Sequence, residues 1–75
     1  MERAGSVART AGTVAVVRSD DDSPPGIGAS LVDQHLEAVG RVVDVFGPVD
    51  RPYLAVTPAS GVHLAGLVGE TLYVR

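Results

Sequence analysis

Short runs of apolar residues rich in Val recur along this chain, and they are separated by glycines, prolines and clusters of polar side chains. Short apolar runs bounded by turn residues are typical of β-strands. Strands are predicted over residues 6–10, 13–18, 27–33, 39–46, 53–57 and 71–75. No window repeats apolar residues at i, i+3, i+4 and i+7, so we expect no long helix.

Turn residues separate the predicted strands. Ala11 and Gly12 join the first two strands in a tight hairpin, because glycine adopts the positive φ that such a turn requires. Residues 20–26 combine three aspartates with two prolines and a glycine, which predicts an exposed loop. Further breaks lie at residues 33–37, 58–61 and 69–70, and residues 62–67 are ambiguous.

Short strands with regularly spaced turns predict an all-β fold, a small six-stranded closed β-barrel whose closure removes exposed strand edges. Without an internal repeat or a linker, residues 1–75 are predicted to form a single domain. Such a small domain buries only about 60–65% of the surface that its unfolded chain exposes. The chain has no Cys, so we expect its stability to depend on the apolar core or on a partner.

The charge of the chain is acidic. The chain has nine acidic and six basic residues, and all six basic residues are Arg, so the net charge is -3. An acidic composition without Lys indicates a protein kept soluble by negative charge in a high-salt cytoplasm. The arginines are scattered along the sequence, whereas phosphate contacts need clustered cations. We therefore expect little direct contact with RNA.

The sequence also bears on location. Its longest apolar stretches fall short of the roughly 20 residues that a membrane helix needs, and the N-terminus lacks the basic and apolar regions of a signal peptide. We expect a soluble, cytoplasmic protein with no membrane partner.

No residue pattern predicts catalysis, a cofactor or a metal. Residues 26–28 lack the third glycine and the following helix of a dinucleotide loop. Residues 20–22 lack the spacing of a calcium loop and are predicted to be solvated. His35 and His63 have no partner Cys or H-x-x-x-H spacing that would define a metal site. No serine lies in a Gly-x-Ser-x-Gly motif, so we expect a protein that is not an enzyme.

Residues 39–58 are the most informative segment, reading VGRVVDVFGPVDRPYLAVTP. Val, Phe and Tyr favour a half-buried pleated surface, while Gly47 and Pro48 mark a reversal, so a hairpin is predicted. This segment, which we call the signature, resembles that of the glycine-arginine-rich-type subunit of H/ACA ribonucleoproteins, the RNA-guided pseudouridylation complexes. The resemblance extends over nearly the whole chain, although residues 59–67 match poorly and are assigned no role.

The resemblance implies a barrel that docks on the catalytic domain of a dyskerin-type pseudouridine synthase without being the catalyst. It implies control of the synthase's mobile thumb loop, and thereby of substrate RNA loading and product release in rRNA pseudouridylation. The H/ACA guide RNA and the other core proteins are then indirect partners. The length matches the archaeal form without arginine-glycine tails, and with the acidic composition it predicts a halophilic archaeal source.

We predict that the partner contacts surround the Gly-Pro turn. Phe46 is the only Phe, and an aromatic ring held on a rigid turn loses little entropy when a partner buries it. The predicted partner-binding residues are Val45, Phe46, Gly47, Pro48, Val49, Pro52 and Tyr53. In the alternative, Phe46 and Tyr53 fill the barrel interior, where Tyr73 is also predicted to lie.

Two other functions compete with this one. Residues 40–45 resemble the Gly-x-Val-x-Asp-Val strand of photoreaction-centre-type barrels, which implies a free-standing adaptor or ligand-binding barrel. That short motif leaves Phe46 and the Gly-Pro turn unexplained. An RNA-binding chaperone would need basic and stacking residues, and the sequence has few of either. An exposed apolar patch would favour binding to a protein partner.

Overall fold

The computed structural model describes residues 2–20 and 24–75, and over these residues the chain forms six strands and one short 3-10 helix. The elements are β1 (Glu2–Ala11), β2 (Val14–Ser19), β3 (Ser30–Val32), β4 (Ala38–Phe46), β5 (Tyr53–Pro58), η1 (Leu64–Leu67) and β6 (Thr71–Val74). All strand pairs are antiparallel, and they close in the order β1-β2-β5-β4-β3-β6. The prediction of an all-β, six-stranded closed barrel is confirmed.

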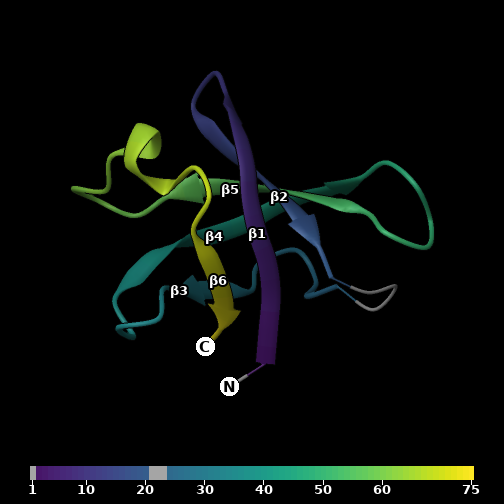
Figure 1. Cartoon of the computed structure of the whole chain (residues 1–75), viewed down its shortest axis with the longest axis horizontal. Helices are drawn as coiled ribbons and strands as arrows, with labels where there is room; N and C mark the ends of the chain where they lie inside the picture. The colour runs from purple at the N-terminus through teal and green to yellow at the C-terminus, as the bar shows by residue number, and fades with distance from the viewer. Residues whose placement is uncertain (1, 21–23) are drawn as a thin grey trace.

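The ends of the chain complete the closure. β1 pairs with β2 on one side and with β6 on the other, where Glu2 lies opposite Val74. Figure 1 shows β1 and β6 side by side in front of β4 and β5, which run crosswise behind them. In the barrel order, β1 therefore lies opposite β4.

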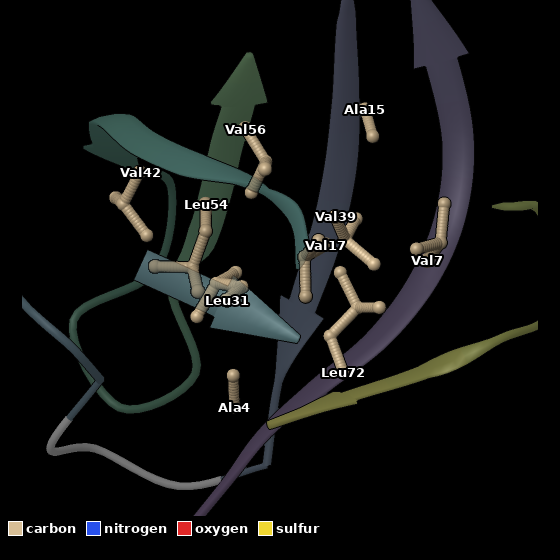
Figure 2. Packing of buried hydrophobic residues seen from close by; sticks show 10 residues of the cluster. All are labelled: Ala4, Val7, Ala15, Val17, Leu31, Val39, Val42, Leu54, Val56 and Leu72. Carbon is tan, nitrogen blue, oxygen red and sulfur yellow. The ribbon is translucent and has the colours of Figure 1, made fainter. Parts of the chain in front are cut away.

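The barrel interior is filled by aliphatic side chains, gathered between the strands in Figure 2. Its buried members are Ala4, Val7, Ala15, Val17, Leu31, Val39, Val42, Leu54, Val56 and Leu72. They come from every strand because each strand contributes alternate residues to the inside. The helix η1 lies against β1 and β2, and its Leu64 and Leu67 pack on the core. The ambiguous residues 62–67 thus hold a single turn that adds apolar contact to the core.

Two strands, β1 and β3, differ from the prediction by more than one residue at an end. β1 begins four residues earlier than predicted, because pairing with β6 extends it. β3 is shorter than the predicted 27–33, since Ala29 N–H donates to the Gly26 carbonyl at 3.1 Å in a turn with Gly28 at a φ of 96°. Of the predicted acidic loop, residues 21–23 lie outside the described residues, as does most of the segment weighed as a calcium loop.

The prediction that Tyr73 is a core residue is wrong. Tyr73 is half-buried and lies outside the core cluster, whereas its neighbour Leu72 is fully buried within it. Successive side chains of a strand point to opposite faces, so only one of the two can point inward. Leu72 points into the barrel and Tyr73 points outward.

Candidate partner-binding surface

The signature forms the β4–β5 hairpin, and register places its aromatic residues on the outside of the barrel. Leu54 and Val56 are fully buried in the core. Because side chains alternate along β5, Tyr53 points outward. Phe46 lies opposite Tyr53, and Tyr53 lies opposite Arg18 of β2. These three side chains therefore form one row across three neighbouring strands.

Direct contacts hold this row together. The rings of Phe46 and Tyr53 stack with centroids 5.7 Å apart and planes 26° apart. Arg18 Nη2 donates a hydrogen bond of 3.1 Å to the Tyr53 hydroxyl, and the guanidinium carbon lies 5.7 Å from the centre of the ring. The hydrogen bond from Arg18, and then its positive charge, lowers the pKa of Tyr53 by favouring the phenolate. The Tyr53 ring is thus fixed from both sides.

Gly47 fits tightly against the same ring. Its φ is 90°, and a Cβ built on it would lie only 2.8 Å from Tyr53 Cδ2. Both the backbone conformation and the space favour glycine at this position. The turn that follows Phe46 is therefore packed on Tyr53, which fixes how the loop leaves the strand.

Large apolar side chains around this row are open to solvent. Phe46 is 39% exposed, Val43 44% and Val49, in the loop between the strands, 92%. Val43 lies where the β4–β5 register shifts between Val42 and Asp44, and such a bulge re-aims a side chain outward. We call Val43, Phe46, Val49 and Tyr53 the hairpin face.

The predicted partner-binding residues divide into two groups. Phe46 does not fill the barrel interior, and neither it nor Tyr53 belongs to the core cluster, so the alternative interior placement is wrong. Gly47, Pro48 and Val49 are exposed. Val45 instead packs against the core, and Pro52 is buried with its carbonyl accepting from Ser19 N–H at 3.1 Å. Val45 and Pro52 therefore attach the hairpin to the barrel.

Two residues of this surface were missing from the sequence prediction. Val43 follows Val42, so two apolar residues stand side by side before Asp44, and that break in alternation was the available signal of a bulge. Arg18 had no such signal, because its contact with Tyr53 spans 35 positions of the chain. Only the pairing of β2 with β5 brings them together.

Two further findings concern the part of the chain that the structure describes. No helix there is long and apolar enough to cross a membrane. Nor is there, among those residues, a group of three or more His, Asp or Glu side chains that could hold a metal ion.

A small closed barrel that presents stacked aromatic rings and exposed valines on one hairpin is the kind of domain that binds a partner. The chain belongs to the Gar1/Naf1 family, since the family model described as the Gar1/Naf1 RNA binding region matches residues 1–75. The predicted family is confirmed. Members of the Gar1 family are non-catalytic components of H/ACA ribonucleoproteins, so the chain is an accessory protein of the H/ACA ribonucleoprotein type.

Individual relatives agree with this assignment. An uncharacterized protein of Methanothermobacter thermautotrophicus is 27% identical over 77 residues, which cover 99% of this chain and 83% of that protein. The solved structure of the Gar1 domain of Naf1 matches with a TM-score of 0.72 at 12% identity, covering 99% of this chain and 81% of that chain. The structural likeness confirms the fold alone. The family's description names RNA binding, and our expectation of little direct RNA contact stays a prediction.

Proposed function

We propose that this chain docks on the catalytic subunit of a dyskerin-type pseudouridine synthase through the hairpin face. From there it regulates the thumb loop of the synthase, substrate RNA loading and product release in rRNA pseudouridylation. The observation that carries the proposal is the hairpin face itself, in which Val43, Phe46 and Val49 are exposed on one hairpin and Phe46 is stacked on Tyr53. Contiguous exposed apolar surface on a small domain marks an interaction site.

The geometry of the hairpin face suits protein docking. Phe46 is stacked on Tyr53 and still 39% exposed, so a partner can bury the rest of the ring without first ordering it. Burying a fully exposed apolar side chain of this size contributes about 1.5–3 kcal/mol, and a partner gains the share that belongs to the exposed 39%. Aromatic residues with fixed geometry often carry most of the binding energy of an interface. Phe46 is therefore the expected anchor and Val49 an outlying contact.

The regulatory half of the proposal rests on family membership and on the accessory role that it brings. A domain that covers one side of the synthase can bias a neighbouring loop only if it binds the two loop positions with different affinity. The proposed setting is a halophilic archaeal cytoplasm, which the acidic, Lys-free composition supports.

The decisive test is calorimetric titration of the chain into the dyskerin-type synthase from the same source, without RNA. We expect saturable one-to-one binding in multimolar potassium chloride. We also expect the chain to change the rate of product release in a guide RNA assay. Absence of binding would refute docking on the synthase while leaving the family assignment in place.

Two substitutions locate the interface. Val49→Asp places a charge at a 92% exposed position, so the fold should stay intact while binding weakens about tenfold or more. Phe46→Ala should weaken binding by at least as much. Val68→Asp is the matched control, since Val68 is 52% exposed and lies outside the hairpin. Equal binding by Val49→Asp and the wild type, with unchanged circular dichroism, would place the interface elsewhere.

A further inference from the structure

A second feature of the outer surface lies at the opposite end of the β4–β5 pair from the hairpin face. It is a hollow of about 240 Å³, and Arg41, Arg75, Ser30 and Thr57 contribute polar groups to its lining. Ala38, Pro58 and Ala59 supply apolar walls. The hollow shares no residue with the hairpin face.

Strand register brings the four polar residues into one row. Thr57 lies opposite Arg41, and Arg41 lies opposite Ser30. On the other side of Ser30, the Arg75 N–H donates a hydrogen bond of 3.0 Å to the Ser30 carbonyl. With about 4.8 Å between neighbouring strands, the backbones of Arg41 and Arg75 lie roughly 10 Å apart with Ser30 between them. Two long cationic side chains therefore flank one hydroxyl.

Gly40 fixes part of the lining as bare backbone. A Cβ on Gly40 would lie 2.1 Å from the Thr57 carbonyl oxygen, because β4 and β5 approach closely there. Real Cβ atoms do not tolerate that distance, so no side chain can stand at this position without moving β5. The signature glycine thus allows β4 and β5 to approach closely beside the hollow.

The two arginines have no partner of their own among residues 2–20 and 24–75. Both are exposed, and neither guanidinium group takes part in a hydrogen bond or ion pair within the described chain, where the Arg3 side chain pairs with Asp20 and that of Arg18 with Tyr53. No described Asp or Glu side chain lines the hollow. Guanidinium groups are donors only, and they form their strongest hydrogen bonds with carboxylates and phosphates. The hollow is therefore complementary to an anion.

We infer that the hollow binds the carboxylate side chain of a Glu or Asp on the protein partner. This inference rests on the proposed function, in which a protein covers the β4–β5 pair. About 240 Å³ is smaller than a typical ligand pocket of about 300–1,000 Å³ and suits one side chain. The apolar walls match the methylene groups of a glutamate. The arginines at the rim then pair with its carboxylate.

RNA fits the same hollow less well. No aromatic residue lines it on which a base could stack. A net charge of -3 opposes the approach of a polyanion, whose binding depends on many cationic contacts. A single carboxylate needs only the two arginines present.

The hollow and the hairpin face can contact one partner together. Arg41 and Phe46 are five positions apart on β4, which is about 15 Å along the strand. An apolar anchor at one end and a charged anchor at the other fix the orientation of the partner on the barrel. Orientation matters for a subunit that biases one particular loop.

The first test compares two double variants of the full chain in titrations with the synthase. Arg41→Gln with Arg75→Gln removes the paired cations and should weaken binding about tenfold, at the lowest salt in which the chain stays folded. Arg3→Gln with Arg9→Gln makes the same charge change on β1, opposite β4, and should leave affinity unchanged. The inference is overturned if both double variants weaken binding equally, or if Arg41→Gln with Arg75→Gln does not weaken it. Binding of the wild type would still support the proposed function in either case.

The second test needs no synthase and so separates the two proposals. The ¹⁵N-labelled chain is titrated with N-acetyl-glutamate methylamide and, separately, with a short single-stranded RNA. We expect saturable shifts of the Ser30, Gly40 and Thr57 amides with the glutamate probe, and none in Arg41→Gln with Arg75→Gln. Saturable shifts with RNA alone, or no shifts with either probe, would overturn the assignment of a carboxylate.

Discussion

Tyr53 is the residue on which the outer surface of the hairpin depends. Its ring stacks on Phe46, its hydroxyl accepts from Arg18, and Gly47 lies against its edge. Together these contacts hold the ring in place. Phe46 can therefore be exposed and still keep one orientation, which is the property that lowers the entropic cost of binding.

The first prediction concerns the link between Arg18 and Tyr53. Arg18→Met removes both contributions that favour the phenolate, the hydrogen bond, which is the larger, and the positive charge. The pKa of Tyr53 should therefore rise toward its ordinary value of 10.0. Ultraviolet titration in a Tyr73→Phe background isolates Tyr53, because the chain has 2 Tyr. Arg9→Met is the control, since Arg9 has the smallest effect on Tyr53. Identical titration of Tyr53 with and without Arg18 would contradict the geometry.

The same shift sets a direction for stability against pH. The folded chain releases the Tyr53 proton at a lower pH than the unfolded chain, so the unfolded state binds more protons between the two pKa values. Stability conferred by this pair therefore rises with pH across the window that ends near the unfolded pKa of about 10. Chemical denaturation at several pH values should show this rise in the wild type and its loss in Arg18→Met.

The second prediction concerns Gly47. Gly47→Ala places a Cβ 2.8 Å from Tyr53 Cδ2 at a φ of 90°, and such strain costs about 1–3 kcal/mol. Urea unfolding should show this loss, and the contacts between the Phe46 and Tyr53 rings should change in nuclear Overhauser spectra. Gly66→Ala is the control because a Cβ there meets nothing within 4 Å. Equal stability of the two variants would show that the turn does not depend on Gly47.

At the level of elements, local pattern predicts the strands that hold an apolar run and fails where distant segments decide. The runs at residues 14–17 and 53–56 end at Arg18 and Thr57, so β2 and β5 could be located from sequence. The start of β1 could not, because Glu2 is in a strand only through its pairing with Val74. Phe46 beside a Gly-Pro turn suggested the hairpin face from sequence. The contact between Arg18 and Tyr53 could not be predicted, because it depends on the pairing of β2 with β5.

The third prediction concerns η1, to which the sequence assigned no role. Leu67 is half-buried and packs on the core cluster, so Leu67→Ala should destabilise the barrel by about 1–2 kcal/mol, less than the 2–5 kcal/mol typical of a fully buried leucine. Val68→Ala, at an adjacent 52% exposed position, should stay within about 0.5 kcal/mol of the wild type. Guanidinium unfolding measures both. If Leu67→Ala is as stable as Val68→Ala, η1 does not contribute to the core.

For the whole molecule, the acidic composition implies that like charges oppose compaction in dilute salt. The net charge is -3 and the domain measures 32 × 27 × 21 Å, so its charges lie within about one to three Debye lengths of each other at 0.1 M salt and part of their repulsion persists. Potassium chloride at about 2 M shortens that length several-fold. The midpoint of thermal unfolding should therefore rise between these two concentrations.

A charge variant separates screening from the general effect of salt on apolar burial. Glu37→Gln, Asp50→Asn and Glu70→Gln remove three negative charges at exposed positions, which brings the formal charge from -3 to zero. If screening is the cause, this variant should gain stability in dilute salt and lose most of its dependence on potassium chloride. If the variant and the wild type respond equally, salt acts through burial of apolar surface, and the acidic surface is not what adapts the barrel to high salt.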